Sequence, residues 1–184
     1  MRQTVRLASA SLERRAILEE MDFNVNVRPV NLDETPVSGE NAPTLVSRLS
    51  LEKLKVSGRG EFWTIAADTV VDISGKVMGK PRDEEEARKT LNSLRGATIC
   101  VWTATSMLSP KGEDFHDLSS ARLEAKEWSQ EDVESYLMSG LWKGRAGSFS
   151  IFHNPTPVVL VEGRLDVVRG LNGRAVCAEV RGEQ

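Results

Sequence analysis

Hydroxyl, basic and carboxylate side chains gather in four short segments of this chain, with one isolated lysine between them. The segments are residues 9–15, 33–34, 67–69 and 79–83, and the lysine is Lys53. A metal-bound phosphate chain needs all three kinds of group, because cations and hydroxyls bind phosphate oxygens and carboxylates bind the metal. These residue types therefore predict an enzyme that handles a triphosphate.

The first segment lies where a strand passes into a helix. Residues 4–8 predict a strand and residues 12–21 a helix that carries Arg14 in its first turn. A helix N-terminus presents free N–H groups and a positive dipole end, to which Ser9, Ser11 and Arg14 would add hydroxyls and a charge. The plain alternative is that Ser11 only caps the helix and that Arg14 is a solvated surface residue.

Two charged side chains extend apolar patterns. Asp68 follows the apolar residues 63–67 at the carboxyl end of a predicted strand, where open α/β sheets bind their ligands. Lys53 continues a stripe of leucines at four-residue spacing in a helix predicted over residues 42–57, which directs it into a cleft. An unpaired buried carboxylate is costly, so a structural ion pair with a lysine is the alternative for Asp68.

The remaining charged segments carry weaker signals. Lys80 lies between Gly79 and Pro81 just before a helix, a position that suits a fixed anion, although an exposed turn lysine would look the same. Asp33 and Glu34 lie in a loop, where two acids are usually solvated. We therefore base the prediction of a phosphate-binding site on all of these segments together, and not on the segment around Lys80 or on Asp33 and Glu34 alone.

Other reaction classes find no support. His116 and His153 are isolated from any serine or cysteine motif, which argues against a nucleophilic triad. The four tryptophans form no stacking series and the basic residues are scattered, so a nucleic acid polymer is not an expected partner. Cys100 and Cys177 match no metal spacing and are expected to be core or near-core thiols.

Composition places the chain among ordinary globular proteins. It has 184 residues, 40% hydrophobic and 28% charged, with a net charge of −3, so any anion site must be local. No apolar run approaches the ~20 residues of a membrane span, and the N-terminus has no long signal-type apolar region. We expect no membrane partner and a cytoplasmic location.

Strands and helices alternate along the chain, which predicts one α/β domain over residues 1–184 with a mostly central sheet. Further strands are expected at residues 23–27, 63–72, 98–108, 116–126, 158–161 and 165–168. Further helices are expected at residues 83–94, with Asp83 as N-cap, and 130–138, with Ser129 as N-cap. Residues 73–76 predict a hairpin turn into residues 77–78, and residues 140–150 a glycine-bearing loop. The ending, residues 174–184, is mostly polar at its tip.

Taken together in order and spacing, these motifs resemble the Maf family of nucleoside triphosphate pyrophosphatases. The resemblance spans roughly residues 5–171 and is specific as a set, although each motif alone is weak. The matching stretches are Leu7-Ala8-Ser9-Ala10-Ser11 with Arg14, Asp33-Glu34, Arg48-Leu49 with Lys53, Ala67-Asp68-Thr69-Val70-Val71, Gly79-Lys80-Pro81 with Asp83 and Glu86-Ala87, Ala146-Gly147-Ser148-Phe149, and residues 162–171.

The resemblance implies a fold, a reaction, an oligomeric state and a cellular role. The fold would be of the Maf/ITPase-like α/β type: a curved mixed central sheet flanked by helices, with two lobes around a deep cleft. The reaction would be metal-dependent hydrolysis between the α and β phosphates of a nucleotide, giving a monophosphate and pyrophosphate, with Mg²⁺ or Mn²⁺ as cofactor. The nucleotide would be non-canonical or modified, the protein a homodimer, and family members are linked to restraint of cell division (septum formation).

It also implies roles for residues. Asp68 would be the general base, Glu34 and Asp68 would bind the metal, and Lys53 and Lys80 would hold phosphates. The other residues expected around the triphosphate are Ser9, Ser11, Arg14 and Arg145.

Three positions depart from the family pattern and leave the base open. Glu13 stands where the pyrimidine-preferring branch has an arginine, and Phe152 where that branch has a glutamine, whereas Thr69 keeps the pyrimidine-type residue. Arg145 replaces a lysine, which keeps charge but not geometry. Glu13, Thr69 and Phe152 are thus the candidates for base selectivity.

Glu13 and Phe152 also motivate an alternative function, a nucleotide-binding regulator of cell division with reduced or no catalysis. A phosphatase acting on a diphosphate or monophosphate is a third interpretation.

Overall fold

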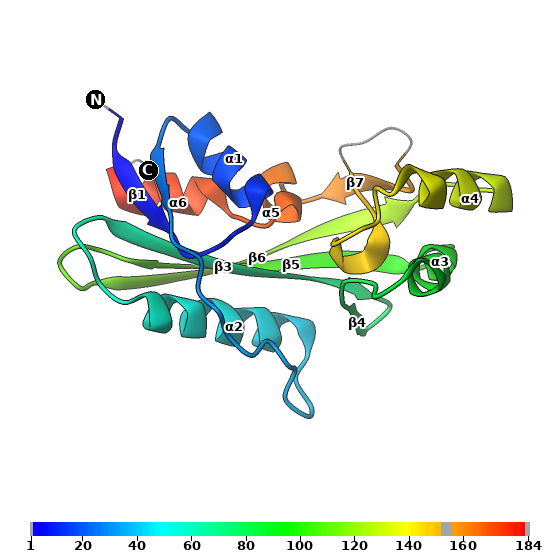
Figure 1. Ribbon diagram of the computed structural model, residues 1–184, viewed down its shortest axis with the longest axis horizontal. Helices are drawn as coiled ribbons and strands as arrows, with labels where there is room; N and C mark the ends of the chain where they lie inside the picture. The colour runs from blue at the N-terminus through cyan, green and yellow to red at the C-terminus, as the bar shows by residue number, and fades with distance from the viewer. Residues whose placement is uncertain (1, 152–155, 183–184) are drawn as a thin grey trace. The chain divides into compact units, whose positions relative to one another are not determined.

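The computed structural model describes residues 2–151 and 156–182 (Figure 1). Its strands are β1 (Thr4–Leu7), β2 (Asn24–Val27), β3 (Trp63–Ile73), β4 (Lys76–Met78), β5 (Thr98–Leu108), β6 (Asp114–Ala125) and β7 (Val158–Glu162). Its helices are α1 (Leu12–Glu20), α2 (Ala42–Ser57), α3 (Glu84–Ser93), α4 (Gln130–Ser139), the 3₁₀ turn η1 (Ala146–Ser148), α5 (Leu165–Arg169) and α6 (Gly173–Arg181).

Across the described residues, the strands form a seven-stranded sheet in the order β2-β1-β3-β5-β6-β7, with β4 paired to β3. β1 pairs in parallel with both β2 and β3, whereas β4 is antiparallel to β3 and β7 to β6. The predicted α/β class with a mixed sheet is therefore confirmed.

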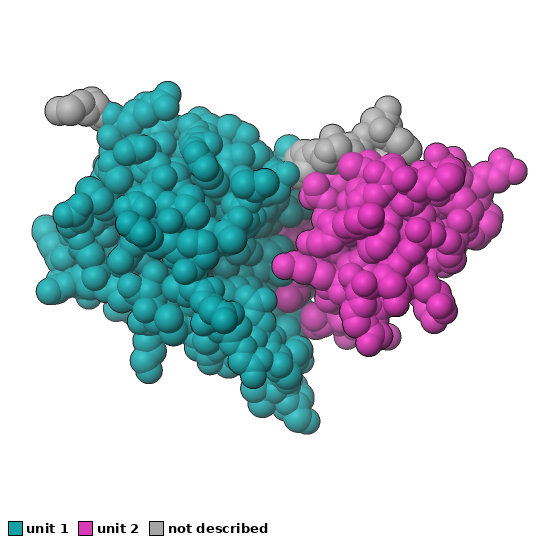
Figure 2. Space-filling view, in the orientation of Figure 1, with its two compact units in different colours: residues 1–69, 102–119, 165–184 teal, residues 70–101, 120–164 magenta. Residues whose placement is uncertain are grey.

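The chain divides into two compact units (Figure 2). The first comprises residues 1–69, 102–119 and 165–184, and the second comprises residues 70–101 and 120–164. Helices α1, α2, α5 and α6 belong to the first unit, and α3 and α4 to the second.

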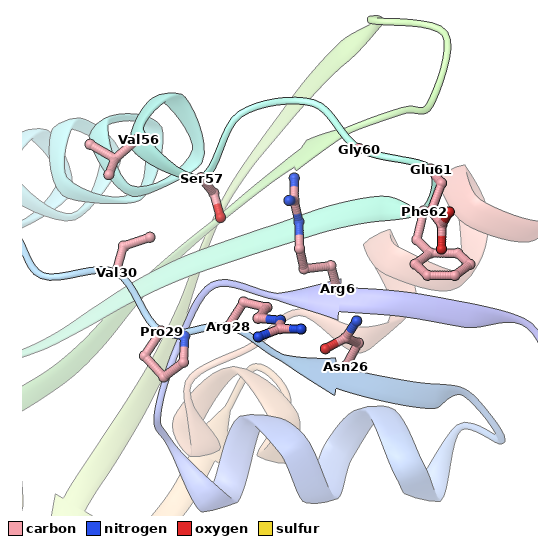
Figure 3. A pocket seen from close by; sticks show the side chains of 10 residues that line it. All are labelled: Arg6, Asn26, Arg28, Pro29, Val30, Val56, Ser57, Gly60, Glu61 and Phe62. Carbon is pink, nitrogen blue, oxygen red and sulfur yellow. The ribbon is translucent and has the colours of Figure 1, made fainter.

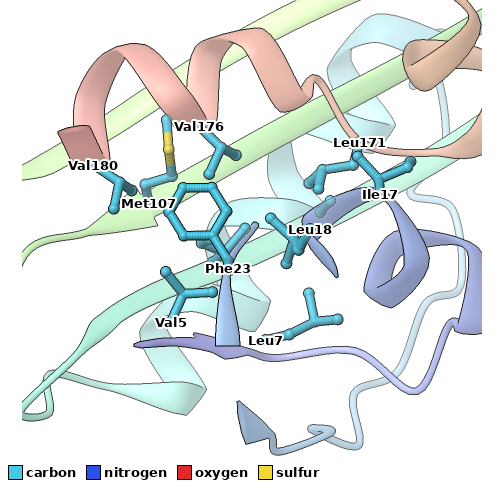
Figure 4. Packing of buried hydrophobic residues seen from close by; sticks show 11 residues of the cluster. Val5, Leu7, Ile17, Leu18, Phe23, Met107, Leu171, Val176 and Val180 are labelled. Carbon is cyan, nitrogen blue, oxygen red and sulfur yellow. The ribbon is translucent and has the colours of Figure 1, made fainter. Parts of the chain in front are cut away.

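The core of the first unit forms because each element buries one face. β1 alternates half-buried and buried residues, so Val5 and Leu7 both point to the face that α1 and α6 cover. Ile17 and Leu18 from α1 and Val176 from α6 meet them in one cluster (Figure 4). α2 lies on the other face, where Leu54 packs with Ala8 and Ala66. The strands of this unit are therefore covered by helices on both sides.

Short-range features of the sequence predicted most of the helices and strands correctly. The bounds of α2 agree with the prediction, and its N-cap is Asn41, whose side chain accepts a hydrogen bond from the Thr44 amide. The caps predicted at Asp83 and Ser129 are present, the second as a capping box.

The C-terminal segment differs from the prediction. The strand expected at residues 165–168 is wrong, because these residues form helix α5. Periodicity does not separate a short apolar run into strand or helix, and here the Asp166 carboxylate holds the turn by accepting from the amides of Val167 and Gly173. α6 was not predicted, although Asn172 caps it.

An ion pair beside the first turn of α2 yields a pH prediction. Arg48 donates to both oxygens of Glu40, at 2.6 and 2.9 Å, which lowers the pKa of Glu40 from 4.5 to about 2. Because the folded pKa is depressed, this carboxylate stabilises the fold above pH 4.5, and that contribution disappears as the pH falls through about 2. We expect Glu40→Gln to flatten the fall in thermal midpoint over this range, measured by circular dichroism. Glu179→Gln on the exposed side of α6 is the control and should leave the profile unchanged.

Candidate active site

The register between β1 and β3 creates the site. Leu7, the last residue of β1, pairs with Ile65, whereas β3 continues to Ile73. Asp68 and Thr69 therefore lie beyond the carboxyl end of β1, beside the turn that leads into α1. Ligands of open α/β sheets bind at this end of the strands.

Lys53 joins two carboxylates from distant parts of the sequence. Its Nζ lies 2.5 Å from Oδ1 of Asp68 and 2.6 Å from Oε1 of Glu34. The side chains of Lys53 and Asp68 are 8% and 9% exposed, whereas that of Glu34 is 54% exposed. Lys53 is thus buried as predicted, and Glu34 is ion-paired rather than simply solvated. The lysine pair foreseen as an alternative for Asp68 is also present.

The environment of Asp68 shifts its proton affinity. Burial raises the pKa of the Asp68 carboxyl above its usual value of 3.8, although the charge and hydrogen bond of Lys53 act in the opposite direction. Arg14 also lowers this pKa, and Glu34 raises it. A carboxyl with a raised pKa is better suited to accept a proton than an ordinary surface aspartate.

Arg14 is held by three acceptors, so the solvated-surface alternative is wrong. Its Nε donates to the Gly170 carbonyl at 2.8 Å, Nη1 to Ser9 Oγ at 3.0 Å and Nη2 to Thr69 Oγ1 at 3.2 Å. Burial lowers the pKa of this guanidinium, while the charges of Asp68 and Glu34 raise it. Three of the five N–H donors are used, which leaves two for a ligand in a fixed orientation.

The serines complete the turn before α1. Ser11 is the N-cap, and its hydroxyl accepts from the Arg14 amide at 3.4 Å. Ser9 Oγ accepts from the Ser11 amide at 3.2 Å as well as from Arg14. Both hydroxyls keep their own proton for donation, at a helix N-terminus that favours anions.

Glu13, the first base-selectivity candidate, has a protein partner. Its carboxylate accepts from Arg169 Nε at 3.1 Å, and Arg169 also holds both oxygens of Glu20. This network joins α5 to α1. It gives the acid at position 13 a structural role that the sequence did not indicate.

The sequence did not indicate the further groups of the protein with which Arg14 and Thr69 form hydrogen bonds. Thr103 lies on β5 with its hydroxyl 3.0 Å from Thr69 Oγ1, and it donates to the Val167 carbonyl at 2.8 Å. The Gly170 carbonyl comes from the turn after α5. A threonine within an apolar strand is only a weak sequence signal of a site residue, and a backbone carbonyl gives no such signal.

The other predicted site residues belong to the second unit. Lys80 follows β4 and is exposed, and Arg145 is the half-buried N-cap residue of η1. The Gly147 amide donates to the Gly79 carbonyl, so the segments that carry Lys80 and Arg145 lie side by side within this unit. Phe152 lies outside the described residues, as does His153.

The donor chemistry fits a hard divalent cation. Within residues 2–151 and 156–182, no group of three or more His, Cys, Asp and Glu side chains could hold a metal alone. Mg²⁺ is usually bound by one or two carboxylates together with substrate phosphates, and Glu34 and Asp68 supply two that converge on Lys53.

A separate pocket of about 420 Å³ lies in the first unit, and none of the predicted site residues lines it (Figure 3). Arg6 forms one wall, with Nε hydrogen-bonded to Thr64 Oγ1. Gly60 packs on the Arg6 guanidinium, since a Cβ there would lie 3.3 Å from it.

His116 lies outside this pocket, and its two ring nitrogens form hydrogen bonds with the hydroxyls of Ser106 and Ser47. In the described part of the chain, no helix is long and apolar enough to cross a membrane.

Gly170 gives a test of how tightly this site is built. Its φ of +104° disfavours other residues, and a Cβ would lie 3.1 Å from Thr69 Oγ1 and 3.3 Å from Arg14 Nε. We expect Gly170→Ala to lower the free energy of unfolding by about 1–3 kcal/mol and to weaken ligand binding by displacing Arg14. Urea unfolding measures the first effect. Gly182→Ala, also at positive φ but with open space around it, is the control that separates backbone strain from the displacement.

Comparison with known proteins places the chain in a family. The family model for Maf-like protein matches residues 4–183, so the chain belongs to the Maf-like family. Relatives include the dTTP/UTP pyrophosphatase of Chelativorans sp. (strain BNC1), 34% identical over 154 residues, and that of Myxococcus xanthus (strain DK1622), 36% identical over 147 residues. Each match covers 79% of this chain and 74% of the relative.

Solved structures give a distant likeness. A nucleoside-triphosphatase (dITP/XTP pyrophosphatase) from Mycobacterium abscessus matches over 96% of this chain and 93% of its own, with 14% identity and a TM-score of 0.46.

Proposed function

We propose that this protein is a metal-dependent nucleoside triphosphate pyrophosphatase, which hydrolyses the α–β phosphate bond to release a nucleoside monophosphate and pyrophosphate. The observation that carries this proposal is the Lys53 cluster. A buried carboxyl of raised pKa lies next to Arg14 and the N-terminus of α1, so a base and an anion site are adjacent. Membership in the Maf-like family and the relatives' names agree with it.

In the proposed reaction, Asp68 accepts a proton from water as the water oxygen bonds to the α-phosphorus. The bond from that phosphorus to the bridging oxygen breaks, and pyrophosphate leaves with the electron pair. Lys53 orients both carboxylates, and Arg14, Ser9 and Ser11 bind phosphate oxygens on the ligand. These contacts are worth most to catalysis where negative charge develops in the transition state.

Glu34 and Asp68 would hold Mg²⁺ or Mn²⁺, which would neutralise charge on the phosphate chain. Lys80 and Arg145 are proposed as further phosphate contacts, and Glu13, Thr69 and Phe152 as positions that influence base choice. For these five residues, the support comes from the resemblance of the sequence to the family.

A homodimer is proposed from the same resemblance, and light scattering would measure the mass of the assembly. The cytoplasmic location stays a prediction.

The test is an assay with the purified protein and Mg²⁺ or Mn²⁺, before and after EDTA. The relatives' names make dTTP and UTP the first substrates, followed by methylated and deaminated nucleoside triphosphates. Equal amounts of monophosphate and pyrophosphate from one or a few substrates are the expected result. Orthophosphate alone would indicate a phosphatase, and tight nucleotide binding without release would favour the regulatory alternative.

A further inference from the structure

The pocket of about 420 Å³ in the first unit lies apart from the residues proposed for catalysis (Figure 3). Arg6 of β1 lines it, and Arg6 pairs in the sheet with Thr64 of β3, which comes four residues before Asp68. At the usual rise of a strand, the backbone at Thr64 lies about 13 Å from the backbone at Asp68. The pocket is therefore a separate place in this unit, toward the first residues of β3.

The guanidinium of Arg6 is held in a fixed orientation. Its Nε donates to Thr64 Oγ1 at 3.0 Å, and its Nη2 donates to the same oxygen at 2.6 Å and to the Gly58 carbonyl. Among the described residues, no acceptor binds the third nitrogen, Nη1. Two N–H donors of an oriented guanidinium thus remain available for a ligand.

A second arginine lines the same pocket. Arg28 directly follows β2 and has an exposed side chain. In the part of the chain that the structure describes, neither Arg6 nor Arg28 forms an ion pair with a carboxylate, whereas Arg48 of the same unit pairs with Glu40. Two guanidinium groups without a carboxylate partner attract an anion, and their planar fork matches the oxygens of a phosphate or a carboxylate.

The rest of the lining favours an organic ligand over an inorganic ion. Pro29, Val30 and Val56 lie together on one side of the pocket, and Glu61 lies beside Phe62 on the other (Figure 3). The volume falls within the range of about 300–1,000 Å³ that is typical of sites for small organic molecules. An inorganic ion would leave the apolar side uncovered, and the Glu61 carboxylate would repel the charged group of a ligand.

We propose that this pocket is a second ligand site, which binds a small organic anion: a phosphate or carboxylate group attached to a single apolar ring. Arg6 and Arg28 bind the oxygens of the anion, and Pro29, Val30 and Val56 cover the ring. Phosphate and carboxylate groups offer these arginines the same chemistry, so the experiment has one arm for each. The proposal does not depend on the proposed function.

Titration calorimetry with phenyl phosphate and with benzoate tests the site. We expect at least one of them to bind with a Kd of about 1 mM or lower, the affinity that so small a ligand can reach. The tighter of the two identifies the charged group. Inorganic phosphate lacks the ring and phenol lacks the charge, so both should bind at least about tenfold more weakly. Binding should also weaken as NaCl is added, because salt screens the arginines.

Substitution of the arginines locates the binding. Arg28→Met should weaken it by about tenfold, the usual effect of one hydrogen bond to a charged group. Arg6→Met should weaken it at least as much, but it also removes the contacts with Thr64 and Gly58, so its thermal midpoint should fall. Arg59→Met is the matched control. It makes the same change of charge in the same loop at a residue that does not line the pocket, and it should bind like the wild type.

Glu61→Gln should have the opposite effect and tighten binding by about two- to fivefold, because it removes a repulsive charge at an exposed position. The proposal is overturned if neither ring compound binds, or if inorganic phosphate binds as tightly as they do. It is also overturned if Arg28→Met binds like the wild type, or if Arg59→Met loses binding equally, since the anion would then lie elsewhere. Arg28→Met should release pyrophosphate at the wild-type rate, so failure of the second site and failure of the proposed function are read from separate measurements.

Discussion

Replacing Asp68 by asparagine should lower kcat by about 10²–10⁴-fold, the range over which a positioned general base contributes. Asparagine has nearly the same shape but cannot accept a proton from water. The fold should survive, because Lys53 keeps its ion pair with Glu34 at 2.6 Å. Release of pyrophosphate from UTP or dTTP under saturating substrate measures the effect, and circular dichroism checks the fold.

Asp72 provides the control for this change. It lies on the same strand, four residues after Asp68, and accepts from the Gly75 amide in the turn before β4. Asp72→Asn should retain the wild-type kcat. An Asp68→Asn protein with full turnover would show that another group removes the proton, and the role of Asp68 would have to be abandoned.

Replacing Lys53 by methionine should lower the free energy of unfolding by about 3–5 kcal/mol near neutral pH, the usual cost of removing one partner of a buried ion pair. The Asp68 side chain is 9% exposed, so water cannot replace the lost cation. Urea unfolding at several pH values measures the effect. Turnover should fall as well, because the loss of Lys53 raises the pKa of Asp68 further and leaves less of the ionised base.

The pH dependence of this variant has a defined sign. Without Lys53, the pKa of Asp68 in the folded state lies still further above its unfolded value, so the folded protein binds the proton more tightly. The stability contribution of this group is then present at low pH and lost as the pH rises through the folded pKa. The double variant Lys53→Met, Asp68→Asn removes the uncompensated charge, so it should recover much of the lost stability and show no such dependence. A Lys53→Met protein as stable as the wild type at pH 8 would contradict the account.

Much of the local structure follows from the sequence alone. The helix over residues 42–57 is marked by apolar residues at four-residue spacing, and Lys53 at the end of that stripe is buried as the spacing predicts. Capping residues mark where other helices begin, because a cap depends on neighbours within three positions. α5 escaped this reasoning, since a short run containing two valines satisfies both the strand and the helix patterns.

The sequence by itself thus determined the carboxylates, cations and serine hydroxyls proposed for the site, the helices and strands that carry them, and the family to which the chain belongs. Only the tertiary structure decided which groups meet. Asp68 reaches Lys53 from 15 residues away, and Gly170 reaches Arg14 from 156 residues away. These contacts depend on the register of β1 against β3 and on how α5 and α6 pack, which local periodicity does not encode. For the same reason, the contacts of the Thr103 hydroxyl with Thr69 and with the Val167 carbonyl depend on how β3, β5 and α5 pack.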